Sequence, residues 1–426
     1  MASDTEDFVF IDHEDVAAAA RPPFLDAISD HVDNIADGLW PVNLKIHDNP
    51  ELGFNEFIAH ETLTSFMKTQ EGWTVTPSAY GLKTAWVAVY DSGRKGPVVS
   101  FNVEMDALPG IGHACGHNLI ASASLAGALA TAHIISRHNL PGKVVIFGTP
   151  AEEGGGGKIK LLNAGAYRDL GVDVSLISHP GTIPDAALMR TAAYTRFKVE
   201  YFGREAHAAA EPWKGINALD ALVTAYNAIS VLRQQTMPGD VIQGYITDGG
   251  VAPNIIHAYA AGIFVARSAT QSRLKELRAQ VGACFAAGAQ ATGAELEVTQ
   301  LGAYADHVPN RALGARYAGY FNALDPPYLI PSDQDVDEIR GTTMASTDQG
   351  DVSYAMPSLS PAFSITPGPN NSGPHNPGFA ETAGTRESFD KCLRVGKALA
   401  GTAVDVLTQK GLLEEVKREW RDATKA

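Results

Sequence analysis

The sequence contains little cysteine and none of the segments that mark a secreted or membrane-inserted chain. Among its 426 residues only three are cysteine: Cys115, Cys284 and Cys392. So small and odd a number excludes a disulfide framework and is typical of a reducing compartment. No uninterrupted apolar run approaches the roughly 20 residues that a membrane-spanning helix requires, and the acidic N-terminus lacks the basic start and apolar core of a signal peptide. We therefore expect a cytoplasmic protein that does not bind membranes.

The chain also contains fewer basic than acidic residues. The chain has 33 lysine and arginine residues against 48 aspartate and glutamate residues, which gives a formal net charge of −15. A chain this acidic repels the phosphates of nucleic acids and anionic lipids, so we expect neither as a partner. The composition is otherwise that of a globular protein, with 45% hydrophobic and 19% charged residues, and the chain is long enough for two domains.

Periodicity divides the chain into a short arm and an α/β domain. Residues 1–21 are interpreted as a flexible acidic arm. Apolar strands that alternate with helices then predict an α/β sheet covered on both faces. The predicted helices lie near 22–39, 54–70, 118–136 and 158–164, and the predicted strands at 98–103, 143–147 and 174–178.

Residues 191–304 follow a different pattern, β-α-β-β-α-β, which is the split βαβ arrangement. We interpret them as an inserted second domain, so the first domain comprises 22–190 and 305–426. The Pro-rich stretch 325–332 is expected to be a surface loop. Within the second domain, strands are expected at 194–202, 241–247, 259–266 and 295–301, and helices at 215–234 and 271–290. The first domain then resumes with a helix at 310–323, a strand at 360–365 and a helix at 383–408.

Ligand-type side chains follow four of the predicted strands of the first domain. In open α/β sheets ligands bind beyond the carboxyl ends of the strands, so these side chains are expected to meet. The four segments are 104–118, 149–157, 179–181 and 367–375.

The residue types in these segments favour metal binding. Thiolate, imidazole and carboxylate groups are suitable zinc ligands. Cys115 and His117 are two residues apart, so one tight loop can direct both at one centre. Of the adjacent Glu152 and Glu153, one can bind metal while the other takes a proton from an activated water molecule. The four glycines that follow let the backbone turn sharply.

Each of these features also has a simpler interpretation. A lone Cys or His in a loop is usually structural, and a Glu-Glu pair is usually solvated surface. A glycine run can bind phosphate, but no Gly-Lys-Ser/Thr follows it here, and no Gly-x-Ser-x-Gly nucleophile motif is present. The coincidence of ligand-type residues after four strands is what favours a metal site.

Taken together, the motifs resemble those of the M20 family of metallopeptidases. They run from Asp-Ala-Leu-Pro at 106–109 through His-Ala-Cys-Gly-His-Asn at 113–118 to Pro-Ala-Glu-Glu and four glycines at 150–157. The nearest branch is the amidohydrolase group, in particular its peptidase M20 domain-containing protein 2 and aminobenzoyl-glutamate hydrolase types, over about residues 45–400. The resemblance implies a mixed-sheet, phosphorylase/hydrolase-like α/β domain that holds two metal ions, with an inserted ferredoxin-like α+β lid.

The same resemblance implies the metal ligands. Cys115 bridges the two ions, Glu153 and His375 complete one site, and His117 and His179 complete the other. The ions are zinc or manganese, and the thiolate ligand favours zinc.

Other residues are assigned roles around the metals by the resemblance. Glu152 is the general base and later the general acid. Asp106 orients a ligand histidine, although a helix or turn cap is the simpler interpretation. The segment 346–353 forms the floor of the site, with Asp348 or Asp351 behind the ligands.

The lid carries a matching motif at 203–209, centred on His207. In relatives this histidine polarises the scissile carbonyl, often from a partner subunit, which implies a homodimer formed through the lid. A histidine that only stabilises a turn is the alternative. Asn254 and Arg267 resemble residues that hold the substrate, and a guanidinium suits a carboxylate. Arg267 is alternatively a surface residue in an ion pair.

The function implied is metal-dependent hydrolysis of the amide bond in a dipeptide or N-acyl amino acid. A basic dipeptide of the β-alanyl-lysine kind is expected, with an aryl amide such as aminobenzoyl-glutamate or a biosynthetic amide as rivals. A non-catalytic metal-binding scaffold is disfavoured because neither the ligands nor the base are missing. Asn118 departs from the aspartate that many members of the branch have there.

Overall fold

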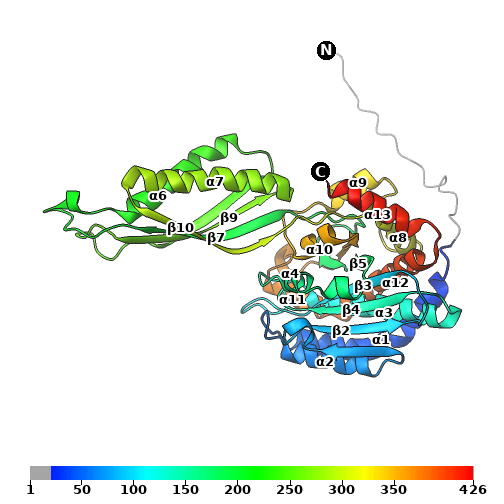
Figure 1. The fold of residues 1–426 in the computed structure, drawn as a ribbon. Helices are drawn as coiled ribbons and strands as arrows, with labels where there is room; N and C mark the ends of the chain where they lie inside the picture. The colour runs from blue at the N-terminus through cyan, green and yellow to red at the C-terminus, as the bar shows by residue number, and fades with distance from the viewer. Residues whose placement is uncertain (1–20, 426) are drawn as a thin grey trace, which may run out of the picture.

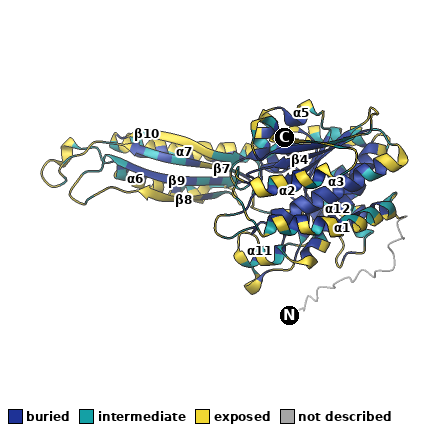
Figure 2. Cartoon of the chain, turned by 90° about the horizontal axis from the view of Figure 1, so that it is seen from below, coloured by how far each residue is buried: buried dark blue, intermediate teal, exposed yellow. Residues whose placement is uncertain are grey.

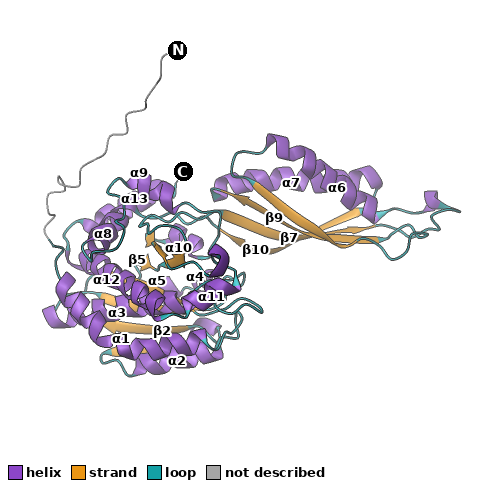
Figure 3. Cartoon of the chain, turned by 180° about the vertical axis from the view of Figure 1, so that it is seen from behind, coloured by secondary structure: helices purple, strands orange, loops and turns teal. Residues whose placement is uncertain are grey.

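The structure is a computed structural model that describes residues 21–425. The predicted arm at 1–21 therefore lies, except for Arg21, outside the described residues. Figure 1 shows a rounded domain from which an elongated second domain projects, and Figure 3 shows that both combine helices with a sheet.

The rounded domain is built on a mixed six-stranded sheet, which confirms the predicted fold class. Its strands follow the order β1-β2-β4-β3-β5-β11, and β12 and β6 pair separately in parallel. β3, β4, β5 and β11 run parallel, whereas β1 and β2 are antiparallel to their neighbours. The strands are β1 (Trp73–Pro77), β2 (Trp86–Asp91), β3 (Val98–Glu104), β4 (Lys143–Thr149), β5 (Val174–Leu176), β6 (His179–Gly181), β11 (Ser358–Leu359) and β12 (Ala362–Ser364).

Helices cover both faces of this sheet because the parallel strands are apolar on both sides, and every residue of β3 is buried. On one face α1 (Leu25–His47), α3 (His117–His138) and α12 (Arg386–Thr408) pack together, with α2 (Phe57–Lys68) beside them. On the other lie α4 (Gly157–Asn163), α5 (Ala166–Asp169) and α10 (Gln349–Ala355). The remaining helices are α8 (Arg311–Asn322), α9 (Gln334–Gly341), α11 (Pro377–Ala383) and α13 (Leu412–Ala423).

The central helix α3 corrects the expectation that no segment of the chain is long and apolar enough to span a membrane. By length and composition it is apolar enough to cross a membrane, but 89% of its apolar window is buried inside the fold. Small residues bring it close to its neighbours: a Cβ at Gly127 would lie 2.8 Å from the Phe101 ring and 3.2 Å from the Gly396 carbonyl oxygen. Figure 2 shows α3 and α12 as the buried centre of the domain.

The elongated domain is a four-stranded antiparallel sheet with two helices on one face and the other face open (Figures 1 and 2). Its strand order, β10-β7-β9-β8, is that of a ferredoxin-like fold. Apolar residues of the sheet and helices form a core separate from that of the first domain. The elements are β7 (Ala193–Phe202), α6 (Ala218–Leu232), β8 (Val241–Asp248), β9 (Tyr259–Ser268), α7 (Gln271–Thr292) and β10 (Glu295–Tyr304).

The elements expected from the sequence are present, and the 325–332 stretch is a loop. Strands β1 and β2 were not expected. β1 is an edge strand whose residues are at most half-buried and which ends in Pro77, so it lacks the continuous apolar run that identified the central strands. Another difference is that His179 begins the separate strand β6 instead of following directly from β5.

Candidate metal centre and active site

Five ligand-type side chains converge at the carboxyl-terminal side of the sheet. They form two groups, within each of which the ligand atoms all lie within 4.8 Å of one another. One group is Cys115, His117 and His179, and the other is Cys115, Glu153 and His375. Because Cys115 belongs to both groups, the geometry is that of two adjacent metal sites sharing a sulfur ligand.

The separations within the groups suit side chains that surround an ion. Cys115 Sγ lies 3.4 Å from His179 Nε2, and Glu153 Oε1 lies 3.4 Å from His375 Nε2. Two ligands about 2.0–2.3 Å from a tetrahedral ion are roughly 3.3–3.6 Å apart.

The buried His117 and the half-buried His179 are oriented by contacts at their other ring nitrogen. His179 Nδ1 donates to the Pro180 carbonyl oxygen at 2.7 Å, which leaves Nε2 to face Cys115. His117 Nδ1 lies 3.2 Å from Asp106 Oδ1, and its Nε2 faces the other ligands. The hydrogen bond of His179 Nδ1 fixes the tautomer that binds metal through Nε2, and the Asp106 carboxylate beside His117 Nδ1 favours the same tautomer there.

Unusual backbone conformations place these side chains. Gly116 has a φ of 75°, and a Cβ there would lie 2.6 Å from Pro180, so glycine lets the chain turn between Cys115 and α3. Ala151 and His375 have φ values of 56° and 65°, in the left-handed region that residues other than glycine seldom adopt. Such backbone strain is characteristic of functional sites.

Asp106 connects the first ligand loop to the second. Its carboxylate accepts hydrogen bonds from the backbone N–H groups of Glu152 at 3.1 Å and Glu153 at 2.9 Å, in addition to its contact with His117. Burial alone would raise the pKa of Asp106, but His117 and the two N–H groups lower it. An ionised Asp106 therefore fixes the Glu152-Glu153 pair relative to His117.

The charge balance of the site fits two divalent cations. One buried ammonium group, Lys158, faces an excess of carboxyl groups. If all of them and the Cys115 thiol are ionised and the imidazoles are neutral, the excess is five negative charges, of which two divalent ions would neutralise four. Glu153 Oε1 and His117 Nε2 are buried without a hydrogen-bond partner among the described residues, as expected of atoms that face a metal. The five carboxyl groups are those of Glu104, Asp106, Glu152, Glu153 and Asp348.

Glu152 belongs to neither of the two groups that contain Cys115, although its carboxylate also lies within 4.8 Å of ligand atoms of His117 and Glu153. It is 6% exposed, and its Oε2 lies 3.9 Å from His117 Nε2. Burial, followed by the nearby carboxylates of Glu104 and Glu153, raises its pKa well above the ordinary value. Glu152 is thus a stronger proton acceptor than an exposed glutamate and is positioned to serve as a general base.

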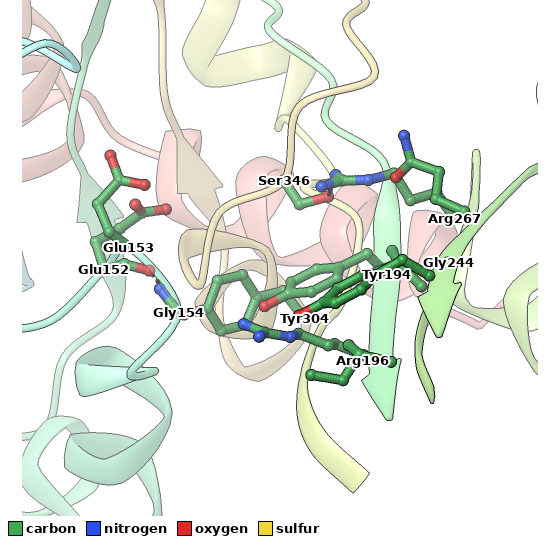
Figure 4. Close-up of a pocket in the computed structure, with 13 residues that line it drawn as sticks. Glu152, Glu153, Gly154, Tyr194, Arg196, Gly244, Arg267, Tyr304 and Ser346 are labelled. Atoms are coloured by element: carbon green, nitrogen blue, oxygen red, sulfur yellow. Dashed lines mark hydrogen bonds between the residues drawn. The ribbon is translucent and has the colours of Figure 1, made fainter. Parts of the chain in front are cut away.

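Two cavities meet at Glu152. The larger, of about 460 Å³, lies between the active-site loops and the open face of the lid sheet, where Tyr194, Arg196 and Arg267 face Glu152 and Glu153 (Figure 4). The smaller, of about 300 Å³, continues past Cys115 and His179. Its other lining residues are mostly apolar or hydroxylated, including Thr182, Ile183, Met189, Thr191, Thr343 and Thr347.

The structure places Arg267 at the larger cavity, where a substrate-binding residue was expected. Its Nη1 donates to Ser346 Oγ at 2.8 Å and to the Met344 carbonyl oxygen at 3.2 Å. The guanidinium also lies 5.1 Å from the centre of the Tyr194 ring. These neutral contacts hold the group in place and leave its charge without a carboxylate partner among the described residues.

The structure separates His207 and Asn254 from this site within one chain, whereas Arg267 lies at it. His207 pairs with Ile255 in an isolated bridge, just beyond the ends of β7 and β9 that are farthest from the first domain. β7 and β9 each have ten residues, which span about 30 Å. His207 and Asn254 therefore lie at the far tip of the lid.

The exposed His207 ring has a defined tautomer. Its Nδ1 accepts hydrogen bonds from the backbone N–H groups of Ala209 and Ala210, both at 3.2 Å. An accepting Nδ1 carries no proton, so the neutral ring presents an N–H at Nε2. That is the donor required to polarise a carbonyl group.

Sequence reasoning missed four residues that support the site, namely Glu104, Lys158, Arg196 and Tyr304. Lys158 Nζ donates to Glu104 Oε1 at 2.6 Å and to Asp348 Oδ1 at 2.5 Å. Tyr304 accepts from the N–H groups of Gly154 and Gly156 and donates to the Glu152 carbonyl oxygen at 2.7 Å. The sequence did contain a signal for Glu104, because this residue directly follows a predicted strand and lies two residues before Asp106. No local sequence feature, by contrast, indicates that Tyr304 lies beside the glycine loop.

Comparison with known proteins agrees with this geometry. The family model described as "Peptidase family M20/M25/M40" matches residues 100–400. A mouse (Mus musculus) protein named Xaa-Arg dipeptidase is 37% identical over 92% of this chain and 91% of its own length. A p-aminobenzoyl-glutamate hydrolase protein of Escherichia coli is 26% identical over 92% of this chain and 92% of its own length.

Solved structures share the fold at low sequence identity. An aminobenzoyl-glutamate utilization protein from Klebsiella pneumoniae matches with a TM-score of 0.64 at 20% identity, over 91% of this chain and all (100%) of that one. The Bacillus subtilis YXEP protein, described as a dinuclear metal-binding peptidase of the M20 family, matches with a TM-score of 0.63 at 19% identity, over 90% of this chain and 99% of that one.

Proposed function

From the premise that the chain belongs to peptidase family M20/M25/M40, we propose that it hydrolyses the amide bond of a dipeptide or N-acyl amino acid at the centre built around Cys115. Membership makes it a metal-dependent hydrolase of peptide or other amide bonds. The observation that carries the proposal is that two groups of metal ligands share Cys115 while Glu152, beside them, belongs to neither.

The metal-binding groups are Cys115, Glu153 and His375 for one ion, and Cys115, His117 and His179 for the other. Zinc is the proposed metal because a thiolate and imidazoles suit it, and manganese is the alternative. When bound, the two ions supply Lewis-acid chemistry that polarises the scissile carbonyl and lowers the pKa of a water molecule.

Residues of the chain control the protons. Glu152 takes a proton from the attacking water as the new C–O bond forms, and it delivers a proton to the leaving nitrogen as the C–N bond breaks. His207 donates its Nε2–H to the carbonyl oxygen as negative charge develops there. The products are a carboxylic acid and an amine.

His207 is proposed to act on the active site of a partner subunit in a homodimer formed through the lid domains. Its position at the tip of the lid, about one ten-residue strand from its own metal centre, supports this role. Asn254 lies beside it and would reach the same partner site. Exposed apolar side chains on the lid, including Trp213, Val231 and Tyr245, fit a surface covered in an assembly.

The substrate is proposed to carry a free carboxylate next to the scissile amide, bound by Arg267. Arg267 faces the cavity that contains Glu152 and Glu153, on the amine side of the bond in this assignment. The smaller cavity, with its apolar and hydroxyl lining, would receive the acyl group. The names of the relatives cover both dipeptide and aminobenzoyl-glutamate substrates.

The decisive experiment combines metal analysis with a substrate panel. The protein is purified, depleted with a chelator and reloaded with zinc or manganese, and hydrolysis of dipeptides and N-acyl amino acids is followed by release of the free amine. We expect two ions per chain, loss of activity on depletion and recovery on reloading. Activity that persists without metal on a verified substrate would refute the proposal.

We also propose a cytoplasmic location, because the three cysteines Cys115, Cys284 and Cys392 are all free thiols in the structure. A thiolate ligand must stay reduced to bind metal. Fluorescent fusion at either terminus, with fractionation as an independent measurement, tests this assignment.

A further inference from the structure

The open face of the lid sheet carries two guanidinium groups on neighbouring strands beside the metal centre. Arg196 of β7 lies opposite Val265, and Arg267 of β9 lies opposite Tyr194. The two arginines are therefore diagonal neighbours on one face of an antiparallel pair, about 7–8 Å apart at the backbone. Both line the larger cavity together with Glu152 (Figure 4).

These two charges are not neutralised within the protein. Among residues 21–425, neither Arg196 nor Arg267 forms an ion pair, and the polar contacts of Arg267 are with Ser346 and a backbone carbonyl. Lys198 provides a contrast, because this next residue on the same face of β7 is bound to Glu200 at 2.7 Å. Two guanidinium groups that face a cavity without a carboxylate partner are suited to bind an anionic ligand.

The remaining lining of the two cavities is consistent with an anion and not with a cation. In the larger cavity the other polar side chains are neutral: Tyr194, Gln243, Tyr245, Tyr304 and Ser346. Within the described residues, the acidic groups that line either cavity are Glu152 and Glu153, which the mechanism and the metals already use. A lysine or arginine side chain of a substrate would thus meet like charge in the larger cavity and no free carboxylate in the smaller one.

We propose that Arg196 selects amides whose amine-side residue is acidic, so that Arg267 binds the α-carboxylate and Arg196 binds the side-chain carboxylate. The substrate class is N-acyl glutamates and aspartates, together with dipeptides that end in these residues. This inference rests on the proposed function, since it assigns the substrate of that same site. It differs from the basic dipeptide expected from the sequence resemblance and is compatible with the rival aminobenzoyl-glutamate, for which it names the selecting residue.

The test uses a series of amides that share one acyl group and differ in the amine-side residue: glutamate, glutamine, methionine or arginine. With metal-loaded enzyme, we expect kcat/KM for glutamate to exceed that for glutamine by roughly 10- to 100-fold, the discrimination typical of a charge-assisted bidentate contact. Arginine should be the poorest member. Arg196→Gln should reduce the glutamate-to-glutamine ratio to about one.

Two further variants sharpen the result. Arg196→Glu should reverse the order of the glutamate and arginine substrates, because it reverses the charge at the selecting position. Lys198→Gln, on the same strand and face but outside the cavity lining, should keep the wild-type ratio. Arg196 is exposed, so these substitutions leave the lid core intact, and a thermal melt verifies folding.

The possible outcomes separate the inference from the function on which it rests. Hydrolysis that prefers arginine, or a glutamate preference that survives Arg196→Gln, overturns the inference and leaves the amide hydrolase standing. Failure of the metal-loaded enzyme on every amide in the series and on the wider dipeptide panel overturns both.

Discussion

Asp106 Oδ1 lies 3.2 Å from His117 Nδ1 and also accepts the backbone N–H of Glu152. One side chain thus contacts both a proposed metal ligand and the proposed general base. We expect the proposed catalysis to depend on this shared contact, because a shift of either group by about 1 Å would disrupt the reacting geometry.

Replacing Asp106 with asparagine should weaken metal binding. Asp106→Asn keeps the shape of the side chain but removes the charge that faces His117, and losses of roughly 10- to 100-fold in metal affinity are typical of such changes. Competition with a chromogenic chelator measures the effect. Asp185→Asn is the matched control, since Asp185 also accepts a backbone N–H but lies away from the metal ligands. Equal affinities in wild type and Asp106→Asn would contradict the assignment.

Glu152→Gln should abolish proton transfer while leaving both metals bound. General-base removal typically lowers kcat by roughly 10²- to 10⁴-fold. Elemental analysis should still find two ions, because Glu152 belongs to neither ligand group that contains Cys115. Glu153→Gln, by comparison, should lose an ion together with activity. Glu152→Gln enzyme with wild-type kcat would exclude the proposed base.

Mixing two inactive variants tests whether His207 acts across the dimer. His207→Ala and Glu152→Gln each lack one catalytic group, but a mixed dimer contains one site with both groups if His207 comes from the partner. Random reassembly should then restore about a quarter of wild-type activity. Action within one chain predicts no recovery. A different affinity tag on each variant, with copurification of the two chains, verifies that subunits have exchanged.

Lys158→Met should destabilise the protein strongly. Lys158 is fully buried and contacts Glu104 and Asp348, so its removal leaves two interior carboxylates without their cation, at a cost of roughly 3–5 kcal/mol. Lys143→Met is the control: it breaks an ion pair with Asp91 that is about 40% exposed and should cost less than about 1 kcal/mol. Urea unfolding of the metal-loaded variants gives both values. Similar losses for the two variants would contradict the importance of the buried pair.

His307 should make stability depend on pH. Burial lowers the pKa of His307 to about 4 in the folded chain, whereas the unfolded chain retains the ordinary value of 6.5. Between these pH values the unfolded state binds more protons than the folded state. The contribution of His307 to the free energy of unfolding is therefore complete above about pH 6.5 and is lost as the pH falls toward 4. His307→Asn keeps a donor for the Met189 carbonyl oxygen and removes the titration.

The difference between wild type and His307→Asn isolates this group from others that titrate. On lowering the pH from about 7.5 to about 4, wild type should lose roughly 3 kcal/mol relative to the variant. Urea unfolding at several pH values measures the two curves. Parallel curves would show that His307 is not the group responsible.

The sequence by itself determined the features that depend on local spacing and composition. Apolar runs identified the central strands, and the split βαβ pattern identified the lid, because burial on one or both faces leaves a period in the sequence. Cys115 and His117 share one loop, and Glu152 and Glu153 are adjacent, so their nearness to one another was already encoded. The edge strand β1 left no such trace, because partial burial imposes no clear period. Strand β2, which lies between β1 and β4, was missed although Trp86, Val87 and Ala88 are buried.

Only the tertiary structure decided which residues that are far apart in the sequence come into contact. His375 reaches Glu153, and Tyr304 reaches the Glu152 loop, because the order of the strands brings their ends together. The antiparallel register of β7 with β9 places Arg196 beside Arg267 on one face, and the same two strands carry His207 away from its own site. Strand order and register are set by packing of the whole core, and no local stretch of sequence contains that information.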